Sequence, residues 1–280
     1  NVKVLSDSKS DVVISLFTNI SILISLFGKV TSSVVAAEHG QYFAHGFFIR
    51  LMRRVTYRKV DAVVALTTTD AAIYSKLFGG KGRCIPNGIS GIPKEKSTGK
   101  TKRLIAVGRL VKEKGFDTLI VIAGSVLEKE KGWSLALYGD GYEREKLTRL
   151  IDANQSRKRI TLPGFEKNVA RALAGASIYL CTSRTESFGM AIAEGMACAL
   201  PVVSFDCPTG PRDIIEDGVN GFLVPVGDNE LFADRVCLLM RDDKLRIKMG
   251  RAARKSVERF LPGRIATLWD ELLDSLVEVR

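Results

Sequence analysis

The stretch "SIYLCTSRTESFGMAIAEGMACALPVVSF" spans residues 177–205 and has the pattern of one strand–helix–strand unit. Its ends, 177–183 and 201–205, are short apolar runs of the kind that form parallel strands buried on both faces. Residues 188–199 between them are mostly small and apolar, and we expect them to form a helix. A strand, a helix and a strand in this order predict a parallel sheet with helices packed against it.

The same alternation continues along the whole chain. The apolar runs expected to be strands lie at 11–16, 32–38, 61–67, 82–87, 103–108, 133–139, 159–165, 177–183, 201–205 and 221–226. Helical patterns are found near 19–29, 46–59, 70–78 and from 228 to 279. The fold class is therefore α/β, with doubly wound parallel sheets.

A polar segment divides the two series of strands. Residues 91–102 are rich in lysine, glycine and proline and offer little to bury, which favours a linker. We expect a first Rossmann-like domain over 1–92, a linker over 93–102 and a second Rossmann-like domain over 103–262. The helix at 263–280 is expected to pack back toward the first domain.

The first series holds about four strands and the second holds six. The chain also begins at Asn1 rather than at a methionine. We therefore expect that residue 1 is an internal point of a longer protein, whose opening strand–helix units precede it.

The composition favours anionic partners. The chain has 42 Lys and Arg against 31 Asp and Glu, a net charge of +11, and a field of that sign attracts phosphates, nucleotides, nucleic acid or acidic lipid. Its five cysteines form no CxxC pair and only two histidines are present. A disulfide framework and a histidine-rich metal centre are thus unexpected, and a reducing cytoplasm fits best.

In open α/β sheets, ligands bind beyond the carboxyl ends of the strands. Arg109 follows the strand at 103–108, and Lys114 precedes the next helix, with Gly108 between strand and loop. Two cations beside a helix N-terminus suit a diphosphate. A solvated basic turn is the alternative.

Further candidates follow the next strands. Gly164 and Phe165 end the strand at 159–165 and offer backbone groups and a ring for a flat base, although Phe165 also suits a core position. Glu186 precedes the helix at 188–199, and Glu194 lies inside it. Carboxylates accept hydrogen bonds from the vicinal hydroxyls of sugars, whereas a capping or surface role is the alternative for each.

Taken together, these motifs resemble the retaining glycosyltransferases of family 4, which have the GT-B fold of two Rossmann-like domains. The matching motifs are "PNG" (86–88), "VGRLVKEKGFDTLI" (107–120), "LYGDGYEREKL" (137–147), "LPGF" (162–165), "ESFGMAIAE" (186–194) and "GVNGFLVPVGD" (218–228).

The resemblance implies a role for each site residue. Arg109 and Lys114 would neutralise the donor diphosphate in place of a metal, so no cofactor is expected. Glu186 would bind the transferred sugar, and Glu194 would bind the ribose. The remaining residues follow from their positions: the turn of Gly108 beside the diphosphate, backbone groups of Ser187, Phe188 and Gly189 near the phosphates, Gly164 and Phe165 at the base, and His39 at the donor sugar or acceptor.

The resemblance also implies a reaction. A hexose or N-acetylhexosamine would pass from a nucleotide sugar, UDP-linked, to a glycan or lipid-linked glycan acceptor in cell-surface polysaccharide biosynthesis. The turn in "DCPTGPRDII" (206–215) is the candidate for shaping donor choice. A nucleotide-sugar epimerase of GT-B type is one alternative; a basic nucleic-acid-binding protein is another, although no nucleic-acid-binding motif is recognisable and no nucleic-acid partner is expected.

The basic helix at 47–59 interleaves Arg50, Arg53, Arg54, Arg58 and Lys59 with aromatic and aliphatic residues. It suits an anionic lipid surface, which would place the protein in the cytoplasm, peripheral to the inner face of the cytoplasmic membrane. A solvated helix face is the alternative. The apolar run at 12–27 is too short and polar for a membrane span, and we expect it to form a strand and a helix.

Overall fold

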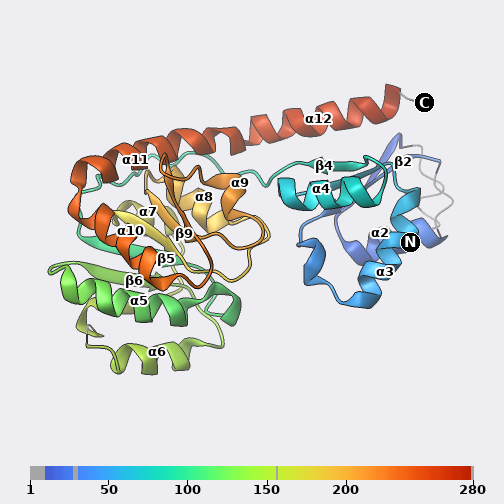
Figure 1. Ribbon diagram of the computed structural model, residues 1–280. Coiled ribbons are helices and arrows are strands. Elements are labelled where there is room, and N and C mark those ends of the chain that lie inside the picture. Colours follow the sequence, from blue (N-terminus) through green and yellow to red (C-terminus); the bar gives the residue numbers. More distant parts are fainter. Residues whose placement is uncertain (1–9, 28–30, 156, 279–280) are drawn as a thin grey trace. The chain divides into compact units, whose positions relative to one another are not determined.

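Ten short parallel strands form two separate sheets in the computed structural model, which describes residues 10–27, 31–155 and 157–278 (Figure 1). The chain divides into two units, one formed by the residues up to Gly88 together with those from Pro262 onward, and the other by Ile89–Leu261. All ten predicted strands are present, so the α/β class with parallel sheets is confirmed. Residues 28–29 of the predicted helix at 19–29, and 279–280 at the end of the chain, lie outside the described part.

The first unit has a four-stranded sheet in which the strands follow one another in chain order. The strands are β1 (Val12–Ser15), β2 (Ser33–Glu38), β3 (Ala62–Ala65) and β4 (Gly82–Cys84), and the helices are α2 (Thr18–Phe27), α3 (Phe47–Thr56), α4 (Thr68–Leu77) and α12 (Pro262–Glu278). Successive side chains of a strand point to opposite faces. Val34 and Ala36 therefore join one core, while Val35 and Ala37 join another that Leu272 of α12 helps to close.

The second unit has a six-stranded sheet in the order β10-β9-β8-β5-β6-β7. Its strands are β5 (Arg103–Val107), β6 (Ser134–Tyr138), β7 (Ile160–Gly164), β8 (Ile178–Cys181), β9 (Val202–Phe205) and β10 (Gly221–Val224). Its helices are α5 (Phe116–Lys129), α6 (Arg144–Asp152), α7 (Val169–Ala174), α8 (Met190–Ala197), α9 (Pro211–Ile214), α10 (Asn229–Arg241) and α11 (Asp243–Ser256). The order reverses between β5 and β8, and such a switch point is where open α/β sheets bind ligands.

Residues 93–102, which were expected to form a linker, belong to the second unit in the structure. Arg254 of α11 donates a hydrogen bond to the Pro93 carbonyl at 2.7 Å, and the buried Ser97 hydroxyl donates to the Ala176 carbonyl. The segment is polar and buries few apolar side chains, but its polar groups bind the unit directly. Composition alone therefore made it resemble a free linker.

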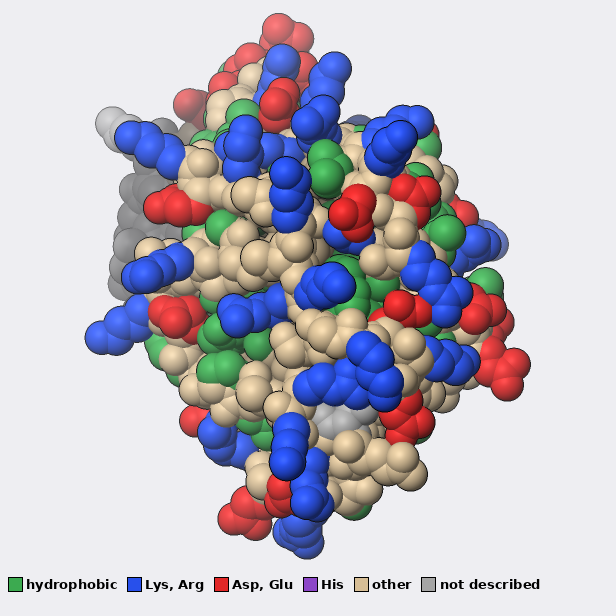
Figure 2. Space-filling model, turned by 90° about the vertical axis from the view of Figure 1, so that its left-hand side faces the viewer, with side chains coloured by type: hydrophobic (Ala, Val, Ile, Leu, Met, Phe, Trp, Pro, Cys, Tyr) green, Lys and Arg blue, Asp and Glu red, His purple; other side chains and the backbone are tan. Residues whose placement is uncertain are grey.

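The apolar run at 12–27 forms β1 and α2. None of the described helices is both long and apolar enough to cross a membrane. Figure 2 looks onto the second unit, where Lys and Arg side chains are interspersed with Asp and Glu over the visible face.

Candidate active site

Two loops meet at the switch point of the second sheet. One follows β5 and carries Lys114; the other follows β8 and carries Glu186. The ammonium group of Lys114 lies 2.6 Å from Glu186 Oε1, and both side chains are mostly buried. A charge-assisted hydrogen bond of this kind is strong and fixes both groups. The structure thus brings together the residue expected at the donor diphosphate and the residue expected at the transferred sugar.

The close approach of the two loops depends on Gly115. This residue has a φ of +65°, a left-handed conformation that favours glycine, and a Cβ atom here would lie 2.1 Å from the Thr182 carbonyl oxygen. The Thr182 hydroxyl in turn donates to the Gly115 carbonyl at 2.9 Å. Backbone therefore packs directly against backbone at the base of the site.

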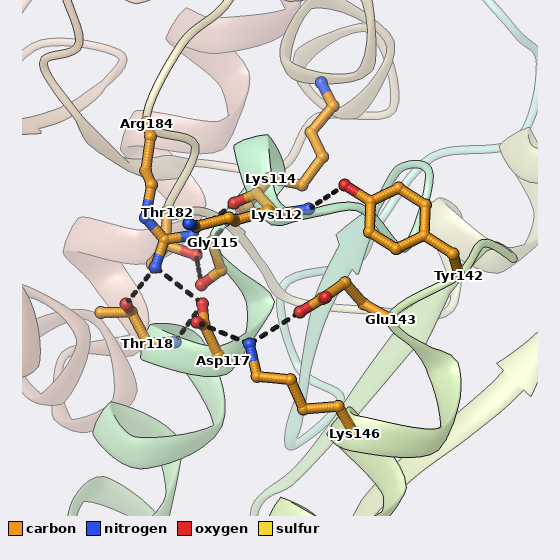
Figure 3. Close-up of polar contacts among 10 residues, drawn as sticks. All are labelled: Lys112, Lys114, Gly115, Asp117, Thr118, Tyr142, Glu143, Lys146, Thr182 and Arg184. Carbon is orange, nitrogen blue, oxygen red and sulfur yellow. Dashed lines mark hydrogen bonds and ion pairs between the residues drawn. The ribbon is translucent and has the colours of Figure 1, made fainter.

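Arg184 links the same two loops to α5 (Figure 3). Its backbone N–H donates to the Glu113 carbonyl at 2.8 Å, and its guanidinium donates to Asp117 Oδ1 at 2.9 Å. Partial burial opposes ionisation of Asp117, but the hydrogen bonds from Arg184 and from the Thr118 N–H outweigh it and lower the pKa of the carboxyl. Arg184 and Asp117 thereby hold the Glu186 loop against α5.

Further hydrogen bonds position Glu186. The Ser183 hydroxyl donates to Glu186 Oε1 at 2.7 Å, and the Thr209 hydroxyl donates to the Glu186 carbonyl at 2.6 Å. Gly210, with a φ of +97°, passes so close that a Cβ atom would lie 2.4 Å from the Phe188 carbonyl oxygen. The turn after β9 therefore supports the Glu186 loop directly.

Glu194 lies inside α8. It lines a cavity of about 320 Å³ whose other walls are mostly apolar and include Ile92, Val169 and Leu173. Removal from water raises the pKa of Glu194. A mostly apolar cavity with one carboxylate at its wall suits a ligand that has a flat apolar part and hydroxyl donors.

The remaining cation, Arg109, extends from the loop after β5 and is exposed. Within the described ranges, no carboxylate lies at ion-pair distance from it. Gly108 lies under the Lys114 side chain, and the Gly139 backbone packs so tightly on Gly108 that a Cβ atom would lie 1.9 Å from its carbonyl oxygen. This close approach explains the glycine at position 139.

The base and phosphate candidates differ in exposure. The Phe165 ring is 76% exposed, so it is not a core residue, and Gly164 before it has a φ of +92°. The Phe188 ring is buried and packs edge-on against Phe260 with ring centroids 5.2 Å apart. Only the backbone of Phe188 can therefore face a ligand, together with half-buried Ser187 and with Gly189, whose φ is +107°.

His39 belongs to the first unit. It follows β2, is exposed, and lines a cavity of about 100 Å³ together with Glu38, Asn87 and Trp269. Among the residues that the structure describes, no cluster of three or more His, Cys, Asp or Glu side chains has an arrangement that could hold a metal ion.

Several residues that position the site are not recognisable from the sequence. They are Asp117, Thr182, Ser183, Arg184 and Thr209. Except for Ser183, which binds the Glu186 side chain three residues away, each acts through a partner distant in sequence or through backbone, as Arg184 does with Asp117, 67 residues away. No local pattern marks such residues; only their position after a strand end gave a signal.

The comparisons with known proteins agree with this architecture. Residues 91–256 match the family model "Glycosyl transferases group 1". The amylovoran biosynthesis glycosyltransferase AmsD of Erwinia amylovora is 28% identical over 262 residues, which cover 91% of this chain and 74% of that protein. A poly(ribitol-phosphate) alpha-N-acetylglucosaminyltransferase of Staphylococcus aureus is 29% identical over 178 residues, covering 63% of this chain and 36% of that protein.

Solved structures share the fold. TarM of S. aureus superposes with a TM-score of 0.83 at 24% identity, covering 97% of this chain and 57% of that one. The lipopolysaccharide outer core galactosyltransferase WaaB superposes with a TM-score of 0.80 at 19% identity, covering 98% and 78%. The chain spans about a third to three quarters of the length of these proteins. The superpositions confirm the predicted GT-B fold class. More than half of its length matches one family model, and the chain belongs to the glycosyl transferases group 1 family.

Proposed function

We propose that the protein transfers a hexose or N-acetylhexosamine from a nucleotide sugar to a glycan or lipid-linked glycan in cell-surface polysaccharide biosynthesis. The observation that carries this proposal is the Lys114–Glu186 pair at the switch point, with the exposed Arg109 on the same loop as Lys114. This arrangement sets cations for a leaving diphosphate beside a carboxylate for sugar hydroxyls.

The donor is proposed to be UDP-linked. A relative 29% identical to this chain is the UDP-N-acetylglucosamine–peptide N-acetylglucosaminyltransferase GtfA subunit of Streptococcus gordonii. The mostly apolar cavity beside Glu194 would take the nucleoside, with ribose hydroxyls donating to that carboxylate, and the exposed Phe165 ring would contact the base. The turn that contains Thr209 would contribute to donor choice, because it supports Glu186.

The chemistry follows from the charges. The bond between the anomeric carbon and the diphosphate oxygen breaks, negative charge grows on the diphosphate, and Arg109 and Lys114 stabilise it. The acceptor hydroxyl attacks from the same face, and its proton passes to the departing phosphate oxygen. Because the two side chains supply the positive charge, we propose that no metal ion is needed and that activity survives EDTA.

The reaction is proposed to occur in the cytoplasm, at the inner face of the cytoplasmic membrane, where a lipid-linked acceptor would lie. His39 of the first unit would contact the donor sugar or the acceptor. Its exposure after β2 leaves the imidazole accessible to a ligand.

Thermal unfolding with UDP-, GDP- and ADP-sugars tests the donor class. A UDP-sugar should raise the melting temperature of the second unit, because a ligand stabilises the state that it binds. The Lys114→Ala variant should lose most of the shift. Equal shifts with all three bases would contradict a UDP donor, and epimer formation without an acceptor would favour the epimerase alternative.

A further inference from the structure

Helix α3 exposes a continuous apolar strip. Phe47 is 75% exposed, Phe48 69%, Leu51 45% and Val55 60%. Positions three to four apart, and their immediate neighbours, fall on one side of a helix, so these four side chains share a face. Large apolar side chains exposed together on one face, rather than scattered singly, are typical of an interaction site.

The opposite side of the same helix packs against the first unit, where Arg53 and Thr56 are buried. Ile49 and Met52 contact the core of the first unit. Arg53, which the sequence places among the lipid-facing cations, is instead buried and pairs with Glu38 at 2.9 Å and with the Tyr74 hydroxyl at 3.0 Å. The helix is therefore anchored on its inner side, and the outer strip remains available.

The charges beside the strip are all positive. Residues 39–60 include no Asp or Glu, and Arg54, Arg58 and Lys59 are exposed there. The Arg50 guanidinium lies 5.7 Å from the centre of the Phe43 ring, which is itself exposed. On the visible face of the second unit, by contrast, cations are mixed with carboxylates (Figure 2).

A comparison with helix α2 shows that the charges beside an apolar face indicate which partner would cover it. It also exposes apolar side chains, including Ile20, Leu23 and Phe27, but it holds no charged residue, so nothing indicates what would cover it. An apolar strip edged by cations alone matches the boundary of an anionic bilayer, where acyl chains meet phosphate headgroups.

We infer that the outer face of α3 docks on a bilayer that contains anionic lipid. Phe47, Phe48, Leu51 and Val55 enter the boundary between headgroups and acyl chains, and Arg54 and Arg58 contact lipid phosphates. The inference rests on α3 and its surroundings, and it holds whether or not the second unit works as proposed.

Sedimentation of the full chain with vesicles tests this. The chain should bind vesicles of phosphatidylcholine with phosphatidylglycerol, and bind those of phosphatidylcholine alone far more weakly. Phe47→Ser with Phe48→Ser should weaken binding by roughly tenfold or more, since two exposed rings no longer enter the bilayer. Arg54→Gln with Arg58→Gln should weaken vesicle binding by about fivefold for each charge removed. Val121→Ser and Arg149→Gln, at exposed positions on helices of the second unit, are the matched controls and should change nothing.

Several results would overturn the inference. One is equal binding to both kinds of vesicle; another is unchanged binding of the Phe47 and Phe48 variant. A third is self-association, seen by light scattering and lost in that variant, without vesicle binding, which would assign the strip to a second copy of the chain. Donor-induced thermal shifts measured on the same variants should be unchanged, so failure of lipid binding and failure of the proposed function give different results.

Discussion

Lys114 Nζ and Glu186 Oε1 lie 2.6 Å apart, although 72 residues separate them in the chain. The pair forms because β5 and β8 are neighbours in the sheet and end at the same edge. In the proposed donor complex the diphosphate would meet Lys114 here, and Glu186 would face the sugar beside it. The pair is therefore an organising contact of the proposed donor site.

Lys114→Ala should lower turnover by about 10²- to 10³-fold, the loss expected for removal of one group that stabilises transition-state charge. Lys112→Ala is the matched control, because that side chain is exposed and lies two residues away on the same loop. Steady-state kinetics with the donor found by thermal shift would measure both. Equal losses in the two variants would show that general loop charge, rather than Lys114, matters.

Glu186→Gln should weaken donor binding by about tenfold, because a neutral amide is a poorer acceptor for sugar hydroxyls than a carboxylate. Ser183→Ala leaves the charge in place and removes one hydrogen bond to Oε1, so its effect should be smaller. Calorimetric titration with donor compares them. A larger loss for Ser183→Ala would mean that the carboxylate acts on the protein rather than on the sugar.

Arg184→Ala should reduce turnover by about tenfold while changing the free energy of unfolding by less than about 1 kcal/mol, since the pair with Asp117 is partly exposed.

The lowered pKa of Asp117 makes the stability of the fold depend on pH. Its pairing stabilises the fold above the pKa of the unfolded state, and this contribution is lost as pH falls through the folded pKa. The stability gap between the wild type and Asp117→Asn should therefore close in acid.

Arg149→Ala is the control for this pair, because Arg149 and Glu145 form a highly exposed ion pair on α6. Neither its turnover nor its stability should change appreciably. If Arg149→Ala lowered turnover as much as Arg184→Ala does, Arg184 would have no specific positioning role.

Glu194→Gln should separate stability from function. The raised pKa of Glu194 means that the folded state bears a cost for the ionised carboxylate at neutral pH. The variant should be at least as stable as the wild type there, and the difference should shrink as pH falls and Glu194 takes up its proton. Donor affinity should nevertheless fall. Thermal melts across pH, with and without UDP-sugar, would measure both; a variant that is much less stable at neutral pH would contradict the argument.

Gly115→Ala should destabilise the second unit by more than about 1–2 kcal/mol, the cost of the left-handed conformation alone, because the added Cβ also meets the Thr182 carbonyl. Gly175→Ala is the control in the same unit, where φ is −77° and the added Cβ would lie no closer than 3.4 Å to its neighbours. Denaturant unfolding compares the two. Similar denaturation midpoints for the two variants would mean that the loops carrying Gly115 and Thr182 can move apart without loss of stability.

The sequence by itself determined the strands and the loops that hold the candidate site residues. Apolar runs located all ten strands, because parallel strands are continuous apolar runs. The loops at the strand ends pointed to Arg109, Lys114, Glu186 and the Gly164–Phe165 turn as candidates, because ligands bind at the carboxyl ends of the strands. These signals are local, so they can be read from one chain.

Only the tertiary structure decided which loops meet and which polar groups are buried. The sheet order sets β5 beside β8, which brings Lys114 to Glu186 and Arg184 to Asp117. It also buries Arg53 of a basic helix and packs the polar segment 93–102 onto the second unit. Pairings across many residues depend on the order of strands and on close backbone contact, and neither leaves a periodic pattern in the sequence.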